Sequence, residues 1–246
     1  MRLSLLAVFA LTLPLAAQEP TFRSRFRVQL GVGGGELEHR TDGSALDDQT
    51  DAGMIRLQFE GTTRRGFGGG VRFEGTASDD DLFADAGFNS SEARLSSLYL
   101  HMTWRAQARR FSMPVRFGLW LNGYTLEDQV LNEEITYGSI GPYLEVAPEV
   151  RLVDRRDFSW SLYGELGAGV AATGIDVDND SNDYYSSTVA FGAEIGTRLR
   201  GGPFEFGVAF VHRWQSMDES DVENGLVVLG YDAEFHGFLV TFSAVF

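Results

Sequence analysis

The residues of this chain with the clearest chemical potential lie near its C-terminal end: His212, Ser216, Asp218 and His236. A base, a hydroxyl and a carboxylate are the groups that ester hydrolysis requires when they meet in space. Both histidines share the apolar side of alternating segments that should pair antiparallel, so we expect them close together near one rim. An anchoring role beside Trp214 accounts for them equally well. These four residues are therefore catalytic candidates, with a non-catalytic role as the alternative.

A second group of residues has the spacing of a cation-binding loop. Asp176, Asp178, Asp180 and Asp183 follow one another like calcium ligands, but the loop lacks the glycine at its sixth position. Ser187 stands where an EF-hand has glutamate. We expect at most weak binding of Ca²⁺ or Mg²⁺ here, and a solvated acidic loop is the alternative. No other cofactor is expected.

Composition excludes several other kinds of chemistry. The 246 residues contain no cysteine, which excludes disulfides and thiolate metal sites. All 20 basic residues are arginine, and the lack of lysine excludes Schiff bases and the Walker-A phosphate loop. The formal net charge of −15 repels phosphate backbones, so no nucleic-acid partner is expected.

The N-terminal segment has the pattern of a secretory signal peptide. Arg2 precedes a long apolar run, and Ala16-Ala17 supplies small residues for a cleavage site. We expect residues 1–17 to be a signal peptide and residues 18–246 to form one domain. Beyond residue 17, no apolar run reaches the roughly 18–20 residues that a membrane helix needs.

The rest of the chain alternates between apolar and polar residues. In the stretch 25–32 every even-numbered residue is apolar, and a period of two places such residues on one face of a β-strand. A tilted strand needs about 9 to 11 residues to cross the apolar core of a bilayer, and most of the segments suffice. The segments are 22–38, 52–63, 68–77, 94–104, 113–124, 136–152, 158–174, 185–200, 203–215 and 226–246.

The connections between these segments alternate between short and long. Short links such as 64–65 and 155–157 are rich in arginine, whereas the long links hold acidic clusters. The long links are 39–51, 78–93, 125–135, 175–184 and 216–225. Transmembrane β-barrels have short periplasmic turns and longer outer loops. We therefore predict an all-β fold, a transmembrane antiparallel up-and-down β-barrel of ten strands with both termini in the periplasm.

Two prolines complicate the strand count. Pro142 and Pro148 fall within the sixth segment, where proline removes a donor from the hydrogen-bond ladder. A closed barrel has no edge strand to hold them, so we expect a bulge or a local break. An early turn at Pro148 would instead leave eight strands.

The polar face of the predicted strands is rich in residues that form ion pairs. In a narrow barrel they would fill the lumen as a hydrogen-bonded ion network, and a thin ion path is the alternative. A soluble β-sandwich would instead turn its apolar face inward. The expected lumen residues are Arg27, Arg56, Arg72, Arg116, Arg151, Arg198, Glu60, Glu74, Glu145, Glu165, Glu194 and Glu205.

The chain ends in an apolar alternating strand with a terminal aromatic residue. Phe238, Val240, Phe242, Ala244 and Phe246 occupy every second position. This pattern resembles the C-terminal assembly signature of outer-membrane β-barrel proteins, and the chain as a whole resembles the broad family of small bacterial barrels of this kind. The resemblance implies a place in the cell outer membrane, contact with its lipids and lipopolysaccharide, and recognition by the barrel-assembly machinery.

Three functions remain open at this point. The leading hypothesis is a non-enzymatic barrel with acidic extracellular loops, serving envelope structure or contact with an external ligand. The second is a narrow, porin-like channel for solutes or ions, and the third is a lipid-modifying hydrolase at the rim around His212 and His236. The run Asp79-Asp80-Asp81 with His212 resembles the carboxylates of outer-membrane proteases, but the surrounding residues do not reproduce that family's motifs.

Overall fold

The computed structural model describes residues 25–43, 47–79, 82, 91–128, 133–155, 157–178, 180 and 182–246, so the predicted signal peptide at 1–17 lies outside the described residues. Within these ranges no helix is long and apolar enough to span a bilayer. The strands are β1 (Arg25–Thr41), β2 (Asp47–Thr62), β3 (Phe67–Ser78), β4 (Ser91–Gln107), β5 (Phe111–Asp128), β6 (Glu133–Val146), β7 (Glu149–Asp154), β8 (Phe158–Val177), β9 (Tyr184–Gly201), β10 (Phe204–Met217) and β11 (Tyr231–Val245).

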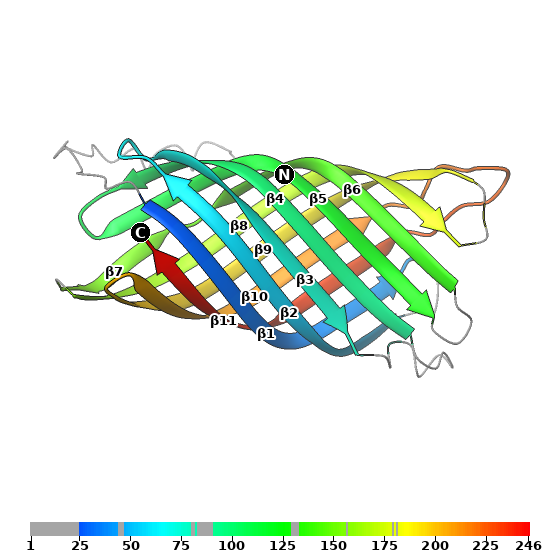
Figure 1. The fold of residues 1–246 in the computed structure, drawn as a ribbon. Coiled ribbons are helices and arrows are strands. Elements are labelled where there is room, and N and C mark those ends of the chain that lie inside the picture. The colour runs from blue at the N-terminus through cyan, green and yellow to red at the C-terminus, as the bar shows by residue number, and fades with distance from the viewer. Residues whose placement is uncertain are drawn as a thin grey trace, which may run out of the picture.

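These strands form one antiparallel sheet that closes on itself (Figure 1). The barrel closes where β1 pairs with β11, from Arg27↔Val245 to Thr41↔Tyr231. With the short β7 as the extra strand, the closed barrel has ten strands. The prediction of an all-β, ten-stranded antiparallel barrel is confirmed, and the eight-stranded alternative is wrong.

The sixth strand position is interrupted at proline, as predicted. β6 ends at Val146 and β7 begins at Glu149, and both pair with β8. Between them the backbone stays hydrogen bonded, because Pro148 accepts a bond of 2.9 Å from the Gly164 amide. The pairing of β6 with β8 also pauses around Pro142, which has no amide hydrogen to donate.

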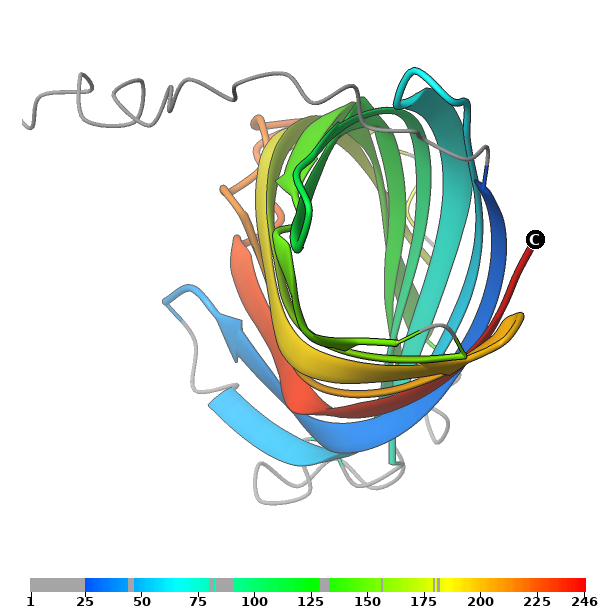
Figure 2. The same ribbon diagram turned by 90° about the vertical axis from the view of Figure 1, so that its left-hand side faces the viewer.

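The register of the strands shows that they are tilted. We start at Arg27 on β1 and pass from each residue to its partner on the next strand, through Glu60, Tyr143 and Gln215. This path returns to β1 at His39 and not at Arg27. A closed barrel needs such a stagger when its strands tilt against the axis. Figure 2 looks along the barrel from the end where the short turns lie, which we call the short-turn end. The opposite end, with the longer links, is the loop end.

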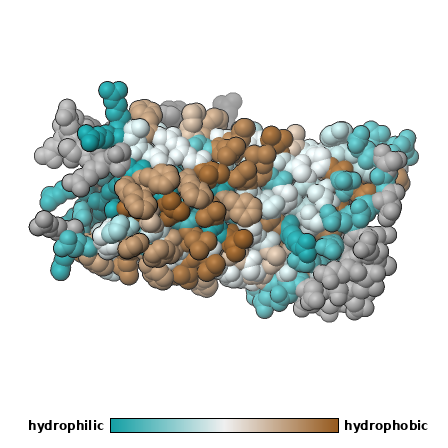
Figure 3. All heavy atoms as spheres, in the orientation of Figure 1, coloured by the Kyte–Doolittle hydropathy of each residue, from teal (hydrophilic) through white to brown (hydrophobic). Residues whose placement is uncertain are grey.

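The polarity of the strands inverts part-way along the barrel. On β1, Leu30 points outward and Gln29 inward, but nearer the loop end Glu36 points outward and Leu37 is fully buried. Figure 3 shows the result as a band of apolar residues over the barrel wall, with hydrophilic residues at both ends. This apolar belt suits contact with lipid. Beyond it, towards the loop end, the barrel continues with a polar outer wall and an apolar interior.

This extension corrects the predicted strand ends. The link expected at 39–51 is largely strand, because β1 continues to Thr41 and β2 begins at Asp47. The links expected at 125–135 and 175–184 are shortened in the same way. In contrast, β11 begins at Tyr231 rather than 226. Acidic residues in these stretches indicated loops, but many of them form the outer wall of strands whose inner face is apolar.

Candidate functional site

The lumen behind the apolar belt is filled by charged side chains. Arg56 Nη2 lies 2.8 Å from a carboxylate oxygen of Glu74 and 2.8 Å from one of Glu194. Arg213 Nε lies 2.9 Å from Glu74, and its Nη2 lies 3.5 Å from Glu194. Because β1, β11 and β10 separate β2 from β9 in the sheet, these contacts cross the lumen.

A second set of ion pairs continues the network through β5, β6 and β8. Arg116 Nη2 lies 2.8 Å from Glu60 Oε2, and its Nη1 contacts Glu145. Arg72 lies 2.6 Å from Glu145 and 3.3 Å from Glu165. All five side chains are almost completely buried. Each carboxylate therefore has a guanidinium partner away from bulk water, which is the condition for keeping buried charges.

The network reaches the short-turn end through Arg198. Its Nη2 lies 3.2 Å from Glu165, its Nε lies 3.9 Å from Glu205, and its guanidinium stacks 3.4 Å from the ring centre of Tyr163. Arg27 Nη2 lies 3.0 Å from Glu205. These contacts join all the residues that the sequence placed in the lumen network except Arg151. Arg151 lies at the short-turn end and pairs with Asp154 at 3.3 Å.

Sequence reasoning missed two arginines of the network. Arg213 is described above, and Arg105 Nη2 lies 3.5 Å from Glu60. Both share the parity of inward residues on their strands, such as Glu205 on β10 and Thr103 on β4. The alternation could have identified them. His212 and Trp214 flank Arg213 and point outward, so the inward arginine stands between two outward polar or aromatic residues.

Aromatic side chains fill the lumen nearer the loop end. The ring centres of Tyr124 and Tyr137 each lie 4.7 Å from that of Tyr231, and His39 stacks on Tyr124 at 5.7 Å. The Tyr124 hydroxyl is hydrogen bonded to His39 Nδ1 at 2.6 Å. We call these residues and the buried Phe235 the aromatic layer. Together they close the interior of the extension with apolar surface.

The order of these layers is visible along one strand. From the short-turn end, the inward residues of β5 include Arg116, Trp120, Asn122 and Tyr124, all buried. A cavity of about 20 Å³ lies beside the ion network and is bordered by Glu74, Trp120 and Arg213. That is room for about one water molecule. Buried side chains therefore occupy space between the ribbons in Figure 2.

The histidine candidates lie on the outer wall just beyond the apolar belt. His212 and His236 are directly paired across β10 and β11. His212 Nδ1 lies 3.4 Å from Glu234, and His236 Nε2 lies 3.1 Å from Glu36. Ser216 is four residues from His212, about 13 Å at the usual rise of a strand. The two histidines are brought together, but the serine is not within hydrogen-bonding reach of His212.

The remaining catalytic and protease-like candidates are also separated. The Asp218 carboxylate accepts a hydrogen bond of 3.0 Å from the Ser187 hydroxyl. Asp79 directly follows β3, and β2, β1 and β11 lie between β3 and the strand of His212. Strands lie about 4.8 Å apart, so Asp79 and His212 are separated by roughly 19 Å along the curved barrel wall. Residues 80–81 lie outside the described residues.

The aspartates of the acidic run do not converge on one point. Asp176 projects outward from β8, and Asp183 is exposed before β9. Asp180 accepts hydrogen bonds of 2.7 Å from Asn182 and 2.6 Å from Tyr184. No group of three or more potential metal ligands occurs among the described residues, which include Asp178.

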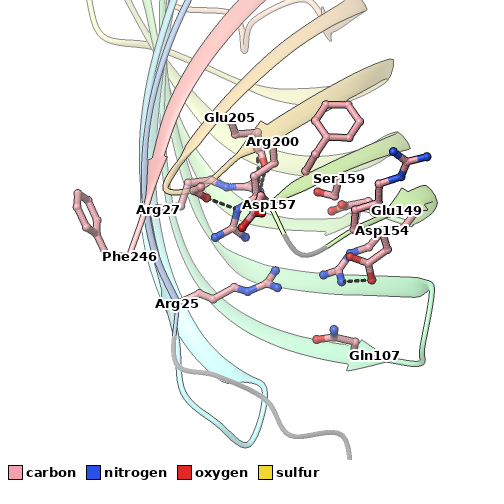
Figure 4. Close-up of a pocket in the computed structure, with 14 residues that line it drawn as sticks. Arg25, Arg27, Gln107, Glu149, Asp154, Asp157, Ser159, Arg200, Glu205 and Phe246 are labelled. Atoms are coloured by element: carbon pink, nitrogen blue, oxygen red, sulfur yellow. Dashed lines mark hydrogen bonds and ion pairs between the residues drawn. The ribbon is translucent and has the colours of Figure 1, made fainter.

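The short-turn end opens into a cavity of about 700 Å³ (Figure 4). Its lining includes Arg25, Arg27, Arg151, Arg155 and Arg200. We call it the vestibule. Arg27 and Glu205, whose ion pair belongs to the network, also line the vestibule, so it borders the ion network.

The predicted assembly strand forms the closing seam of the barrel. Val240 pairs with Val32 and Phe242 with Leu30 on β1, and Ala244 lies beside Val28. Phe238 and Phe246 are exposed on the outer face, at 64% and 73%. The alternating residues are therefore turned to the surroundings of the barrel, within the apolar belt.

Comparison with known proteins identifies the type of barrel. No protein-family model matches the chain, and no curated protein matches it. Among solved structures, the outer membrane protease OmpT from Escherichia coli is 12% identical, with a TM-score of 0.53 over 92% of this chain and 98% of that chain. The fold is that of small bacterial outer-membrane β-barrels.

Two further solved structures match at lower similarity. The translocator domain of the autotransporter NalP from Neisseria meningitidis is 11% identical, with a TM-score of 0.42 over 91% of this chain and 88% of that chain. The transport unit of the autotransporter AIDA-I from Escherichia coli is 10% identical, with a TM-score of 0.42 over 97% and 93%. At these identities the comparison concerns the fold and not the activity.

Proposed function

We propose that this protein is a non-enzymatic barrel of the cell outer membrane that has a closed lumen and acts at its acidic outer end, in envelope structure or in binding an external ligand. The observation that carries the proposal is that buried side chains occupy the lumen from the ion network, through Trp120 and Asn122, to the aromatic layer. A porin-like channel would need an open path where these side chains pack. A lipid hydrolase would need Ser216 beside a histidine.

The apolar belt supports a place in the outer membrane. Short turns face the periplasm in such barrels, so the loop end is the outer end. The belt would contact membrane lipid, and the acidic wall above it would lie among lipopolysaccharide headgroups, where weakly held divalent cations offset like charges. The exposed alternating residues of β11 fit recognition by the barrel-assembly machinery.

An ordered hairpin at the outer end supports surface interaction. In residues 218–230, which we call the outer hairpin, Glu223 and Leu226 exchange backbone hydrogen bonds of 3.0 and 2.8 Å. The turn between them has positive φ at Asn224 (50°) and Gly225 (81°), as a type I′ turn requires. The Asp221 amide donates to the Tyr185 carbonyl at 2.9 Å, which fixes the hairpin to β9.

The chemistry of the outer hairpin defines the kind of partner. Val222 and Leu226 are 69% and 56% exposed, and Val227 and Leu229 are exposed beside them. The segment contains acidic residues and no basic ones. Apolar side chains on a preformed acidic scaffold suit a cationic ligand with an apolar face, because little ordering accompanies binding.

Binding of a synthetic lysine–leucine amphipathic peptide to the refolded protein in nanodiscs tests this proposal. Saturable binding is expected, and the double substitution Val222→Ser with Leu226→Ser should weaken it about tenfold through lost apolar burial. Asp221→Asn should also weaken it, whereas Asp51→Asn, an acidic residue on the outer wall outside the hairpin, should leave it within about twofold. Equal binding by all variants would contradict a role for the hairpin.

A further inference from the structure

The vestibule contains guanidinium groups without counter-ions. Among the described residues, Arg25, Arg155 and Arg200 line this cavity and form no ion pair, although Arg200 Nε donates a hydrogen bond of 3.1 Å to the Gly202 carbonyl. Of the lining carboxylates, Glu205 is paired with Arg27 and Asp154 with Arg151, and Glu149 lies 3.9 Å from Arg198. Asp157 remains as the lining side-chain carboxylate without an ion pair in the described structure. Positive charge therefore exceeds negative charge among the groups still available to a ligand.

Arg25 is the main contributor to this excess of positive charge. Its side chain is half-buried at the start of β1 and projects into the vestibule (Figure 4). The charged groups that act on it most strongly are Arg105, Arg151, Arg200 and Arg27, all of the same sign. Arg105 also has a buried Nε without a hydrogen-bond partner in the structure. A concave wall concentrates the field of such groups, which favours an anion at this position.

The shape of the vestibule limits the size of the ligand. Its volume of about 700 Å³ falls within the usual range for small-molecule sites. The ion network closes its inner side, so a ligand can enter from the short-turn end but cannot continue through the barrel. Guanidinium groups bind carboxylate and phosphate oxygens through paired hydrogen bonds, and three of them set apart around one cavity match a ligand with more than one such group.

We propose that the vestibule is a periplasmic binding site for small polyvalent oxyanions, carrying carboxylate or phosphate groups, with Arg25, Arg155 and Arg200 as the ligand-binding residues. This site lies at the opposite end from the outer hairpin and does not depend on a ligand there. It also gives the closed barrel a second surface for interaction, facing the periplasm.

Calorimetric titration of the refolded full-length protein in a zwitterionic detergent tests the site, with citrate and pyrophosphate as separate probes. Saturable binding of at least one is expected, and the tighter of the two assigns the ligand to the carboxylate or the phosphate class. Arg25→Gln should weaken binding about tenfold or more, since a hydrogen-bonded charge pair is lost. This variant should fold normally, because the substitution removes repulsion and no ion pair.

Arg109→Gln is the matched control, because Arg109 is an exposed arginine in the turn between β4 and β5 and does not line the vestibule. Its affinity for the probe should stay within about twofold of the unsubstituted protein. The proposal is overturned if neither probe binds, if Arg25→Gln binds as tightly as the unsubstituted protein, or if Arg109→Gln weakens binding equally. The last result would indicate general attraction to a basic rim.

Discussion

The guanidinium of Arg56 lies 2.8 Å from Glu74 and 2.8 Å from Glu194, so one buried side chain joins β2 to β3 and to β9 across the lumen. We expect Arg56→Gln to lower the free energy of unfolding by about 3–5 kcal/mol, because two buried carboxylates lose a partner. Urea unfolding followed by tryptophan fluorescence measures the change. Arg94→Gln is the control, since its pair with Glu92 is 55% exposed on the arginine side and should contribute about 1 kcal/mol or less. Similar small effects in both variants would contradict a stabilising network.

Close packing of β1 on β11 gives a second prediction. A Cβ atom on Gly35 would collide with the backbone carbonyl of His236, whereas the nearest atom to one on Gly34 would be 3.5 Å away. We expect Gly35→Ala to reduce the folded fraction on refolding, seen as loss of the heat-modifiable band in electrophoresis, and Gly34→Ala to refold normally. Normal refolding of Gly35→Ala would mean that the seam is paired differently.

The position of the apolar belt can be tested on β11. Val240 is an outward residue within the belt, and His236 lies beyond it beside Glu36. Val240→Arg should lower the free energy of unfolding in lipid bilayers by about 2–4 kcal/mol, because it places a charge in the hydrocarbon region. His236→Arg places a cation near Glu36, outside the apolar belt, and should cost about 1 kcal/mol or less. Reversal of the two effects would place the membrane boundary elsewhere.

The separation of the histidines from Ser216 predicts the absence of lipid chemistry. Cells that produce the protein should have the same masses of lipid A and phospholipids as cells that produce the His212→Ala and His236→Ala variants. Mass spectrometry of extracted lipids makes this comparison. A product that is present with the unsubstituted protein and lost in either variant would restore the hydrolase hypothesis.

The alternation of residues in the sequence predicted the barrel and the side chains behind the apolar belt well. This prediction depends on one physical rule, that successive side chains of a β-strand point to opposite faces. Arg72 must therefore face inward when Phe73 faces outward. The same rule placed His212 and His236 on the outward face of neighbouring antiparallel strands, and the register of β10 with β11 pairs them directly. Pro148 interrupted its strand for an equally local reason, the missing backbone donor.

The extension beyond the belt could not be predicted in the same way. There the environment outside the barrel changes from lipid to water. The apolar side chains therefore move from the outward to the inward face, while the period of two stays the same. Asp48 and Asp176 consequently indicated loops, and the inward placement of Tyr124 and Tyr231 was not foreseen. The vestibule was also missed, because Arg25, Arg155 and Arg200 come from three distant segments that only the closed barrel brings together.

The central claim is that the lumen is closed, and single-channel recording in a planar bilayer tests it most directly. The refolded protein, with folding verified by heat modifiability, should give no discrete conductance steps, because the ion network and the aromatic layer fill the barrel. Discrete steps whose size changes in Arg116→Gln or Glu165→Gln would contradict the claim, since they would show ions passing through the charged layer.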